Sequence, residues 1–190
     1  NYFKKVKYSS TETTLPDGTQ KRDFDNEAVL ERFNHQLKKS NINTRHTLFP
    51  NFSWACENID NLKNEYNLKK YILIFPFCSI NLPHKKWPYY NELINVIKSQ
   101  HNNFEIAVAP GPDEINQATN FNAITVKNNK NSLDLMELAG LIKKSSFVIA
   151  NDTGPAHMAA HLGAKGIVLF GHHTTSKKVS IETEKFKAIS

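Results

Sequence analysis

The chain of 190 residues has few cysteines and no long apolar run. Its two cysteines, Cys56 and Cys78, lie far apart and form no Cys-x-x-Cys motif, which argues against a cysteine-ligated metal ribbon and a redox pair. Two isolated cysteines suit a reducing compartment. No apolar stretch approaches the roughly 20 residues of a membrane-spanning helix. The longest stretches have the length of sheet strands.

The excess of positive charge is moderate. The 24 Lys and Arg against 18 Asp and Glu give a net charge of +6, which suits an anionic small molecule or an anionic membrane surface as a partner. The basic residues are not densely clustered and form no nucleic-acid-binding motif, so we do not expect nucleic acid as a partner. With 39% hydrophobic residues, the chain can form one domain with a core, or one domain and a piece of another.

Apolar segments alternate with helix-like segments from residue 71 onward. The run Tyr71–Phe75 is continuous and is stopped by Pro76, which predicts a strand buried on both faces. Further strands are expected at 104–109, 121–126, 147–150 and 167–170, and helices at 89–100, 113–120, 132–144 and 155–162, with Ser132 as the N-cap of the third helix. This alternation predicts an α/β fold, a Rossmann-like parallel sheet with helices on both faces.

The first third of the chain carries weaker signals. Pro16-Asp17-Gly18 predicts a turn. Residues 27–39 have the pattern of an amphipathic helix, and residues 55–67 that of a second, more polar helix. We assign no chemistry to this part of the chain.

The segment 150–163 has the pattern of a strand end, a tight turn and a helix. Pro155 suits the start of the helix, Thr153 or Asp152 can cap it, and Gly163 suits a left-handed residue at its end. Gly154 has no Cβ, so a ligand can approach the backbone there closely. A helix N-terminus at the carboxyl edge of a parallel sheet favours a phosphate. The same pattern also fits an ordinary capped helix without a ligand.

Two other loops are expected at the same edge of the sheet. The loop after Tyr71–Phe75 carries Lys85 and Lys86, which could neutralise a diphosphate leaving group, and Ser79, which could donate to phosphate. The alternative is a solvated basic loop. After the next strand, Asp113 and Glu114 could accept hydrogen bonds from ribose or sugar hydroxyls, or could simply favour the start of a helix.

The histidines do not form a convincing metal site. His157 and His161 are four residues apart, but Met158 stands where a zinc hydrolase would carry Glu and no third ligand is evident, so we expect no metal. His157, in the first helical turn, is better placed to donate to a phosphate, whereas His161 is expected to be structural. His172 and His173 either border the same cleft or belong to a solvated loop.

These blocks together resemble the C-terminal domain of the lipopolysaccharide heptosyltransferase family, glycosyltransferase family 9. The resemblance is carried by Asn151-Asp152-Thr153-Gly154-Pro155-x-His157-x-Ala159-Ala160, then Leu162-Gly163 and Val168-Leu169-Phe170-Gly171, by Lys85-x-Trp87-Pro88, and by the helix start Ser132-Leu133 with Ala139 and Leu141. It covers residues 71–174 well and 27–70 loosely.

The resemblance implies a two-domain GT-B enzyme of bacterial lipopolysaccharide biosynthesis. Such an enzyme transfers a sugar, with inversion, from a nucleotide-sugar donor such as an ADP-sugar to a glycolipid acceptor of the lipopolysaccharide core, without a metal or other cofactor. It implies a cytoplasmic location, including the cytoplasmic face of the inner membrane. Asp152, Thr153, Gly154 and His157 would hold the donor diphosphate and the adjacent sugar, and Lys85 matches the family's phosphate-binding lysine. Lys86, Glu114 as a nucleoside contact and Ser79, which falls where the family has Thr or Ser, are further candidates.

One departure from the family pattern is large. The family opens with a strand and a Gly-Asp loop that bears the carboxylate thought to act as the base, whereas this chain begins at Asn1 and has only the reversed Asp17-Gly18. We therefore expect 1–70 to be the tail of an N-terminal domain with the interdomain segment, 71–190 to be the C-terminal nucleotide-sugar-binding domain, and the base to lie outside this chain. The alternatives are a nucleotide-sugar epimerase of similar build and a non-catalytic nucleotide-binding module.

Overall fold

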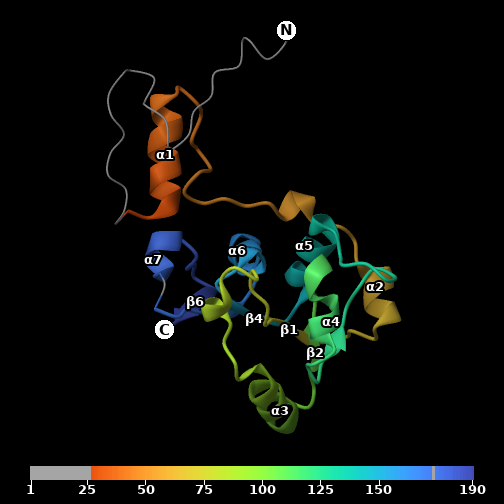
Figure 1. Ribbon diagram of the computed structural model, residues 1–190. Coiled ribbons are helices and arrows are strands. Elements are labelled where there is room, and N and C mark those ends of the chain that lie inside the picture. Colours follow the sequence, from red (N-terminus) through yellow and green to blue (C-terminus); the bar gives the residue numbers. More distant parts are fainter. Residues whose placement is uncertain (1–26, 173) are drawn as a thin grey trace. The chain divides into compact units, whose positions relative to one another are not determined.

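The computed structural model describes residues 27–172 and 174–190 (Figure 1), and the chain divides into two compact units. One unit comprises residues 1–50 and 177–180, and the other comprises residues 51–176 and 181–190. The predicted turn at Pro16–Gly18 lies outside the described residues. No helix within the described ranges combines the length and the apolar character needed to cross a membrane.

The described part of the first unit is built around helix α1 (Val29–Lys39), which confirms the helix expected at 27–39. Lys38 and Lys39 lie in its last turn, where positive charge favours the helix dipole. The left-handed residue Asn41 (φ 56°) then turns the chain, and the Ile42 N–H donates to the Leu37 carbonyl at 3.0 Å. The Leu30 N–H donates to Ser180 Oγ at 3.3 Å, which ties α1 to the short segment 177–180.

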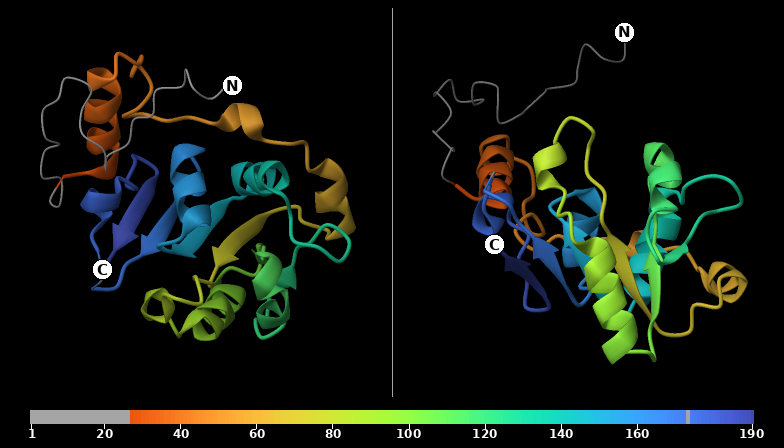
Figure 2. Two further views of the ribbon diagram at one scale, coloured as in Figure 1. Left: turned by 45° about the horizontal axis from the view of Figure 1, so that its top comes forward. Right: turned by 60° about the horizontal axis from the view of Figure 1, so that its bottom comes forward.

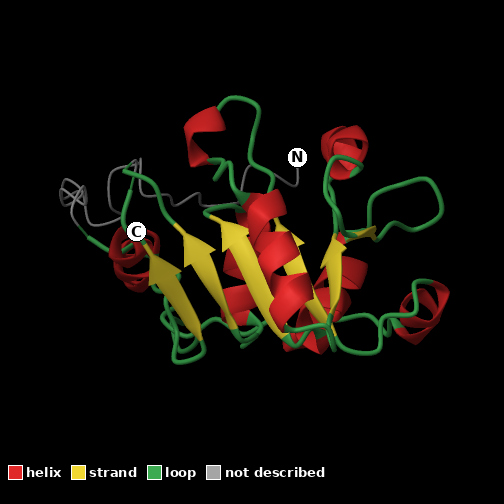
Figure 3. Ribbon diagram, turned by 90° about the horizontal axis from the view of Figure 1, so that it is seen from below, coloured by secondary structure: helices red, strands yellow, loops and turns green. Residues whose placement is uncertain are grey.

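The second unit is built on one sheet of six parallel strands in the order β3-β2-β1-β4-β5-β6. The strands appear as yellow arrows in Figure 3. The strands are β1 (Tyr71–Phe75), β2 (Glu105–Val108), β3 (Ile124–Thr125), β4 (Phe147–Asn151), β5 (Gly166–Leu169) and β6 (Phe186–Ile189). β1 pairs with both β2 and β4, so residue Ile72 lies opposite Ile106 on one side and Phe147 on the other. This arrangement confirms the predicted α/β fold and the predicted strands, except that the strand expected at 121–126 is reduced to Ile124–Thr125.

Helices cover both faces of the sheet (Figure 2, left). On one face, α3 (Tyr90–Gln100) and α4 (Ile115–Ala118) pack against a core that includes Ile72 and Ile74. On the other face lie α5 (Leu135–Lys144) and α6 (Gly154–His161), and the buried Tyr71 hydroxyl donates to the Leu141 carbonyl at 2.6 Å. Burial on both faces explains why all five residues of β1 are apolar, because neither face meets water.

The shorter elements lie in the connections. They are the 3-10 turns η2 (Ser53–Ala55), η3 (Pro83–Lys85) and η4 (Pro112–Glu114) and the helices α2 (Asp60–Glu65) and α7 (Ser176–Val179). The helix expected at 113–120 is therefore a 3-10 turn followed by the four-residue α4. Neither α7 nor β6 was expected from the sequence, because β6 is only four residues long and carries a lysine.

Two predicted helix starts were wrong. Helix α5 begins at Leu135 rather than near Ser132, because Asp134 Oδ1 accepts hydrogen bonds from the Met136 and Glu137 N–H groups at 2.8 Å, and the Asp134 N–H donates to Glu137 Oε2 at 2.9 Å. The helix expected at 55–67 occupies only Asp60–Glu65. Asn58 Oδ1 accepts from the Asp60 N–H at 2.8 Å, and this side-chain turn replaces the first predicted helical turn.

The segment 51–70 belongs to the second unit and packs against its helix α5. Ile59 and Leu68 are buried in it, and the Glu57 N–H donates to the Met136 carbonyl at 3.1 Å. Helix α5 admits this segment closely because residue 140 is glycine: a Cβ there would lie 2.4 Å from the Glu57 carbonyl oxygen and 2.9 Å from Ile59 Cγ2. The assignment of residues 1–70 to an N-terminal domain stays a prediction.

We expect Gly140→Ala to destabilise the protein. Overpacking against a backbone atom costs about 1–3 kcal/mol, which exceeds the roughly 1 kcal/mol that Ala gains over Gly inside a helix. The midpoint of urea unfolding should fall with an unchanged m-value. Gly154→Ala is the matched control, because a Cβ at residue 154 meets no atom within 4 Å. Equal midpoints for the two variants would contradict the predicted role of Gly140.

Candidate functional site

The candidate site lies at the carboxyl edge of the sheet, where β1 and β4 are neighbours. From β1 the chain proceeds to β2 and β3 on one side of the sheet, and β4 to β6 lie on the other side, so β1 and β4 flank the topological switch point. Open parallel sheets bind ligands in the crevice at this point. A cleft of about 350 Å³ opens here, lined by Phe75, Phe77, Cys78, Ser79, Ala109, Pro110, Gly111, Pro112, Glu114, Leu133, Leu135, Leu138, Thr153, Gly154 and Pro155.

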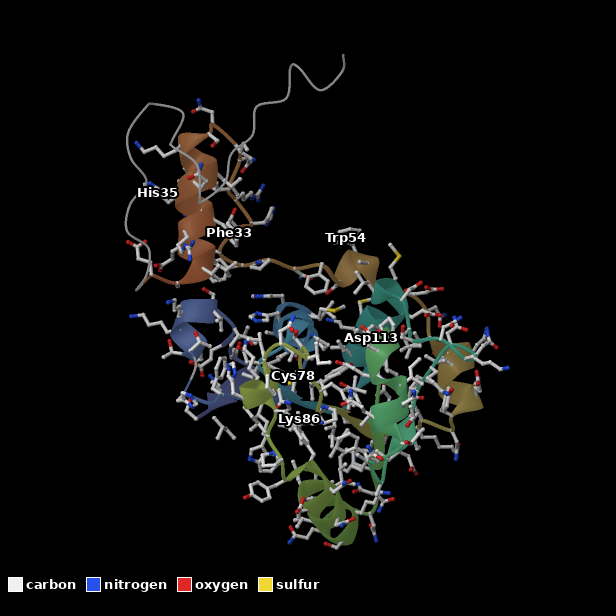
Figure 4. All side chains as sticks on the ribbon, in the orientation of Figure 1. Phe33, His35, Trp54, Cys78, Lys86 and Asp113 are labelled. Carbon is white, nitrogen blue, oxygen red and sulfur yellow. The ribbon has the colours of Figure 1, made fainter. Side chains whose placement is uncertain are left out.

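The structure brings the predicted site residues to this edge in two groups. Four of them line the cleft itself: Ser79, Glu114, Thr153 and Gly154. Lys85, Asp152 and His157 form a contact cluster at the first turn of α6. Lys86 follows Lys85 in the exposed loop after β1, and Figure 4 shows it with Cys78 from the same loop.

Asp152 is the centre of the charged cluster. Its carboxylate is almost fully buried. Oδ2 accepts a hydrogen bond from Lys85 Nζ at 2.6 Å, and Oδ1 lies 3.5 Å from His157 Nε2. Lys85 Nζ also lies 3.4 Å from the Asp152 carbonyl oxygen. A buried carboxylate needs such partners because the loss of water disfavours its charge. The pair therefore fixes the Lys85 ammonium beside the start of α6.

Asn151, the residue before Asp152, is fully buried and was not predicted as a site residue. Its Oδ1 accepts from the Tyr90 hydroxyl at 3.0 Å and from the Trp87 N–H at 3.3 Å, and its Nδ2 donates to the Phe77 carbonyl at 3.3 Å. The sequence did offer a signal. An amide side chain at the end of a buried apolar strand must find hydrogen-bond partners.

The N-terminus of α6 differs from the prediction in one respect. Thr153 occupies the N-cap position, but its hydroxyl donates to the Asn151 carbonyl at 3.3 Å and makes no capping hydrogen bond. The predicted side-chain cap by Thr153 is therefore wrong, whereas a cap by Asp152 stays a prediction. The positive end of the helix dipole faces the cleft beside Gly154. At the other end Gly163 is left-handed (φ 69°), as predicted.

Glu114 is held at the opposite side of the cleft. The Gly111 N–H donates to its Oε2 at 2.8 Å. Burial raises the pKa of the Glu114 carboxyl; the hydrogen bond from Gly111 acts against this, the charge of Asp113 adds to it and that of Lys86 opposes it. Asp113 itself is exposed (Figure 4). The next loop thus presents one partly buried carboxyl group to the cleft.

Ser79 and Cys78, from the loop after β1, line the cleft. Ser79 is exposed, and its Oγ accepts from the Asn81 N–H at 3.4 Å. Burial raises the pKa of the Cys78 thiol, as does Glu114, while Lys86 and Lys85 lower it. The raised pKa favours the neutral thiol as a wall of the cleft.

The remaining histidines take different positions. His161 is half-buried, and burial together with the charge of His157 lowers its pKa, which favours the neutral form. The exposed ring of His172 lies 6.4 Å from that of His84, and His173 is outside the described residues. Across residues 27–172 and 174–190, no three His, Cys, Asp or Glu side chains are grouped as metal ligands.

An apolar groove adjoins the cleft on the far side of Pro155. Its volume is about 570 Å³, and it shares Leu135, Leu138, Gly154 and Pro155 with the cleft. Its other walls are Phe52, Trp54, Ala55, Met136, Ala139 and Met158. Trp54 is 82% exposed there (Figure 4).

The sequence profile of glycosyltransferase family 9 (heptosyltransferase) matches residues 14–186. No curated protein matches the chain.

Several solved structures have the same fold. A glycosyl transferase of family 9 from Veillonella parvula is 16% identical, with 88% of this chain and 49% of that chain covered and a TM-score of 0.65. The E. coli ADP-heptose lipopolysaccharide heptosyltransferase II is 18% identical, with 68% and 41% covered and a TM-score of 0.56. The E. coli heptosyltransferase WaaC with ADP-2-deoxy-2-fluoro heptose is 18% identical, with 84% and 47% covered and a TM-score of 0.54. The chain spans less than half the length of each.

We expect Lys85 and Asp152 to be energetically coupled. Lys85→Met leaves a buried carboxylate with weaker compensation, and we expect it to lower the free energy of unfolding by roughly 1–3 kcal/mol, below the full cost of an isolated buried charge because His157 remains. In the double variant with Asp152→Asn the losses should not add, and the coupling energy should exceed about 1 kcal/mol.

Urea unfolding of the two single variants and the double variant measures this coupling. Lys98→Met is the matched control, because Lys98 Nζ contacts Asn122 at an exposed site, and a change within about 0.5 kcal/mol is expected. Strict additivity of the Lys85 and Asp152 substitutions would show that the contact contributes nothing to stability.

Proposed function

The chain belongs to glycosyltransferase family 9 (heptosyltransferase), and from its site geometry we propose that it supplies the donor-binding part of a sugar-transferring enzyme. The donor is a nucleotide sugar, an ADP-sugar such as ADP-heptose, and the acceptor is a lipopolysaccharide-core or related glycolipid. The observation that carries the proposal is the meeting of Lys85, His157 and the N-terminus of α6 beside one cleft at the β1–β4 switch point.

The diphosphate of the donor is proposed to bind at this meeting point. An ammonium group has three donors. Asp152 Oδ2 and the Asp152 carbonyl account for two of the directions around Lys85 Nζ, and the third suits a phosphate oxygen. The helix dipole and the backbone near Gly154 add positive potential without the bulk of a Cβ. Lys86, on the same loop, adds a second exposed positive charge.

Asp152 itself is better suited to a neighbouring group than to phosphate. Its carboxylate has the same sign as a phosphate, so direct contact would be repulsive. It orients Lys85 and His157, and it can accept hydrogen bonds from hydroxyl groups of the sugar next to the diphosphate. Its predicted role in donor binding is thereby divided between positioning the cationic groups and contacting the sugar.

The nucleoside is proposed to occupy the cleft between α6 and the loop after β2. Leu133, Leu135 and Leu138 offer an apolar wall for a base. Glu114, held by the Gly111 N–H, offers carboxylate oxygens to the ribose hydroxyls. Ser79 lies on the third side of the same cleft.

The proposed reaction is a single displacement with inversion. The acceptor oxygen forms a bond to the anomeric carbon while the bond from that carbon to the diphosphate breaks, and a base takes the acceptor proton. Lys85 and the N-terminus of α6 stabilise the charge that develops on the departing diphosphate. The base is proposed to lie outside these 190 residues, in the part of the enzyme that meets the acceptor. The net charge of +6 suits work at an anionic cytoplasmic membrane surface in bacteria.

Nucleotide titration by calorimetry tests the proposal. We expect ADP to bind, and Lys85→Ala to weaken ADP binding about 10- to 100-fold through the loss of a charge-assisted contact. The affinity for adenosine, which lacks the phosphates, should fall much less in Lys85→Ala. Gly154→Ala should also weaken ADP binding, because the added Cβ faces the cleft. Lys98→Met should leave ADP binding unchanged.

Failure of a folded sample to bind ADP at millimolar concentration would refute donor binding of an ADP-sugar. Tighter binding of UDP than of ADP would show that the nucleotide of the donor carries uracil rather than adenine. Turnover of the donor without an acceptor, assayed with the full gene product, would indicate an epimerase, and binding without any turnover by that product would indicate a non-catalytic module.

Adenosine binding should weaken on acidification. Burial raises the pKa of Glu114 above its ordinary value. As the pH falls, its carboxylate is therefore protonated earlier than that of an exposed glutamate. Protonation removes charge and an acceptor from the ribose contact. Titration with adenosine from about pH 7.5 to about pH 5 avoids the titration of phosphate near pH 6. In Glu114→Gln the affinity should be lower and nearly independent of pH; the same pH profile in wild type and variant would remove Glu114 from the nucleoside site.

A further inference from the structure

We infer that Asn151 is a positioning residue that sets the place of the phosphate-binding loop, residues 77–87, at the edge of the sheet. The inference rests on the proposed function, because the loop matters through Lys85. It concerns how Lys85 reaches the diphosphate and assigns no contact between Asn151 and the ligand.

One side chain holds both ends of the loop. Asn151 Nδ2 donates to the Phe77 carbonyl at 3.3 Å, at the start of the loop, and Asn151 Oδ1 accepts from the Trp87 N–H at 3.3 Å, at its end. A third bond, from the Tyr90 hydroxyl at 3.0 Å, attaches the same amide to helix α3. The residue thus links β4, α3 and both ends of the loop.

The bonds within the loop do not locate it on the sheet. Leu82 N–H donates to the Ser79 carbonyl at 2.9 Å, and the Lys85 and Lys86 N–H groups donate to Leu82 and Pro83 at 3.0 Å. These bonds shape turns inside the loop. Asn151, the last residue of β4, bonds to the loop backbone, and Asp152, the next residue, bonds to Lys85. Two successive residues at the end of β4 therefore hold the loop backbone and the loop cation.

Only an amide of this length satisfies all three partners. The site requires an acceptor facing two donors and a donor facing a carbonyl, in a place with no access to water. Aspartate would place a second acceptor against the Phe77 carbonyl, and leucine would remove one hydrogen bond from each of the three partners. Burial also raises the pKa of the Tyr90 hydroxyl, which keeps it protonated and able to donate.

Trp87 makes the position of the loop measurable. Its ring packs edge-on against Tyr90 at 5.2 Å and against Tyr89 at 5.7 Å, so its environment depends on the anchored loop end. The chain has two tryptophans, and the other, Trp54, is 82% exposed. In a Trp54→Phe background, the fluorescence of Trp87 reports on the loop alone.

The test compares Asn151→Ser with Asn95→Ser in that background. Asn95 is exposed on α3, so its substitution controls for the loss of an amide. We expect Asn151→Ser to shift Trp87 emission to longer wavelength, to increase quenching by acrylamide, and to weaken ADP binding about tenfold or more, as displacement of a positioned charged group does. Adenosine affinity should change less than about twofold, because the main proposed nucleoside contacts, the wall of Leu133, Leu135 and Leu138 and the carboxyl group of Glu114, lie outside this loop. Asn95→Ser should change none of these.

Unchanged Trp87 fluorescence and an unchanged ratio of ADP to adenosine affinity would overturn the inference, and so would equal losses for both ligands, which indicate general destabilisation. If Asn151→Ser does not fold, Tyr90→Phe decides: it keeps the ring and removes the bond to the Asn151 amide together with the weaker 3.5 Å bond to the Phe75 carbonyl, and it should change the same quantities in the same direction by a smaller factor. Wild-type values for Tyr90→Phe would then refute the inference. If ADP does not bind the wild type, the proposed function fails, while the fluorescence comparison still decides whether Asn151 positions the loop.

Discussion

The parallel pairing of β1 with β4 is the constraint on which the rest of the structure depends. Ile72 to Phe75 lie opposite Phe147 to Ala150, so the two strands end at the same level. The loop that follows β1 and the turn that follows β4 must therefore start side by side. Lys85 and Asp152, 67 positions apart in the chain, meet only because this pairing brings their strands together. The apolar core of the sheet is thus what supports a charged site at its edge.

The cost of burying polar groups explains the order within that site. Asn151 is 0% exposed and Asp152 4% exposed, and neither position is tolerable without partners. Each residue recruits its partners from the loop after β1, the amide from the backbone and the carboxylate from Lys85. The loop is consequently attached at the two buried polar side chains that need hydrogen-bond partners to offset their loss of water. A ligand that approaches Lys85 finds an ammonium that is already oriented, so less conformational entropy is lost on binding.

Most of the fold could be predicted from the sequence because the decisive signals are local. The continuous apolar run of β1 and the glycine at 163 depend on residues close in sequence, and both predictions were confirmed. The prediction of Ser132 as N-cap was wrong, because Asp134 is the residue whose side chain accepts hydrogen bonds from the first N–H groups of α5. Strand β6 was missed because its pairing with β5 comes from tertiary contact rather than from its short alternating pattern. For the same reason the residue types of the site were expected, but the partners of Asn151 and the contact between Lys85 and Asp152 were not.

The two halves of a sugar transfer make different demands on a protein. Stabilising a departing diphosphate needs fixed positive potential, which one helix terminus and one oriented lysine can supply from a single sheet edge. Activating the acceptor needs a base within hydrogen-bond reach of the attacking hydroxyl, on the side of the anomeric carbon opposite the leaving group. Under the proposed function, the cluster at the edge of this sheet faces the leaving group, and the base belongs to the side that meets the acceptor. Donor binding by this chain, which spans less than half the length of its structural relatives, and sugar transfer by the full enzyme can therefore be measured separately.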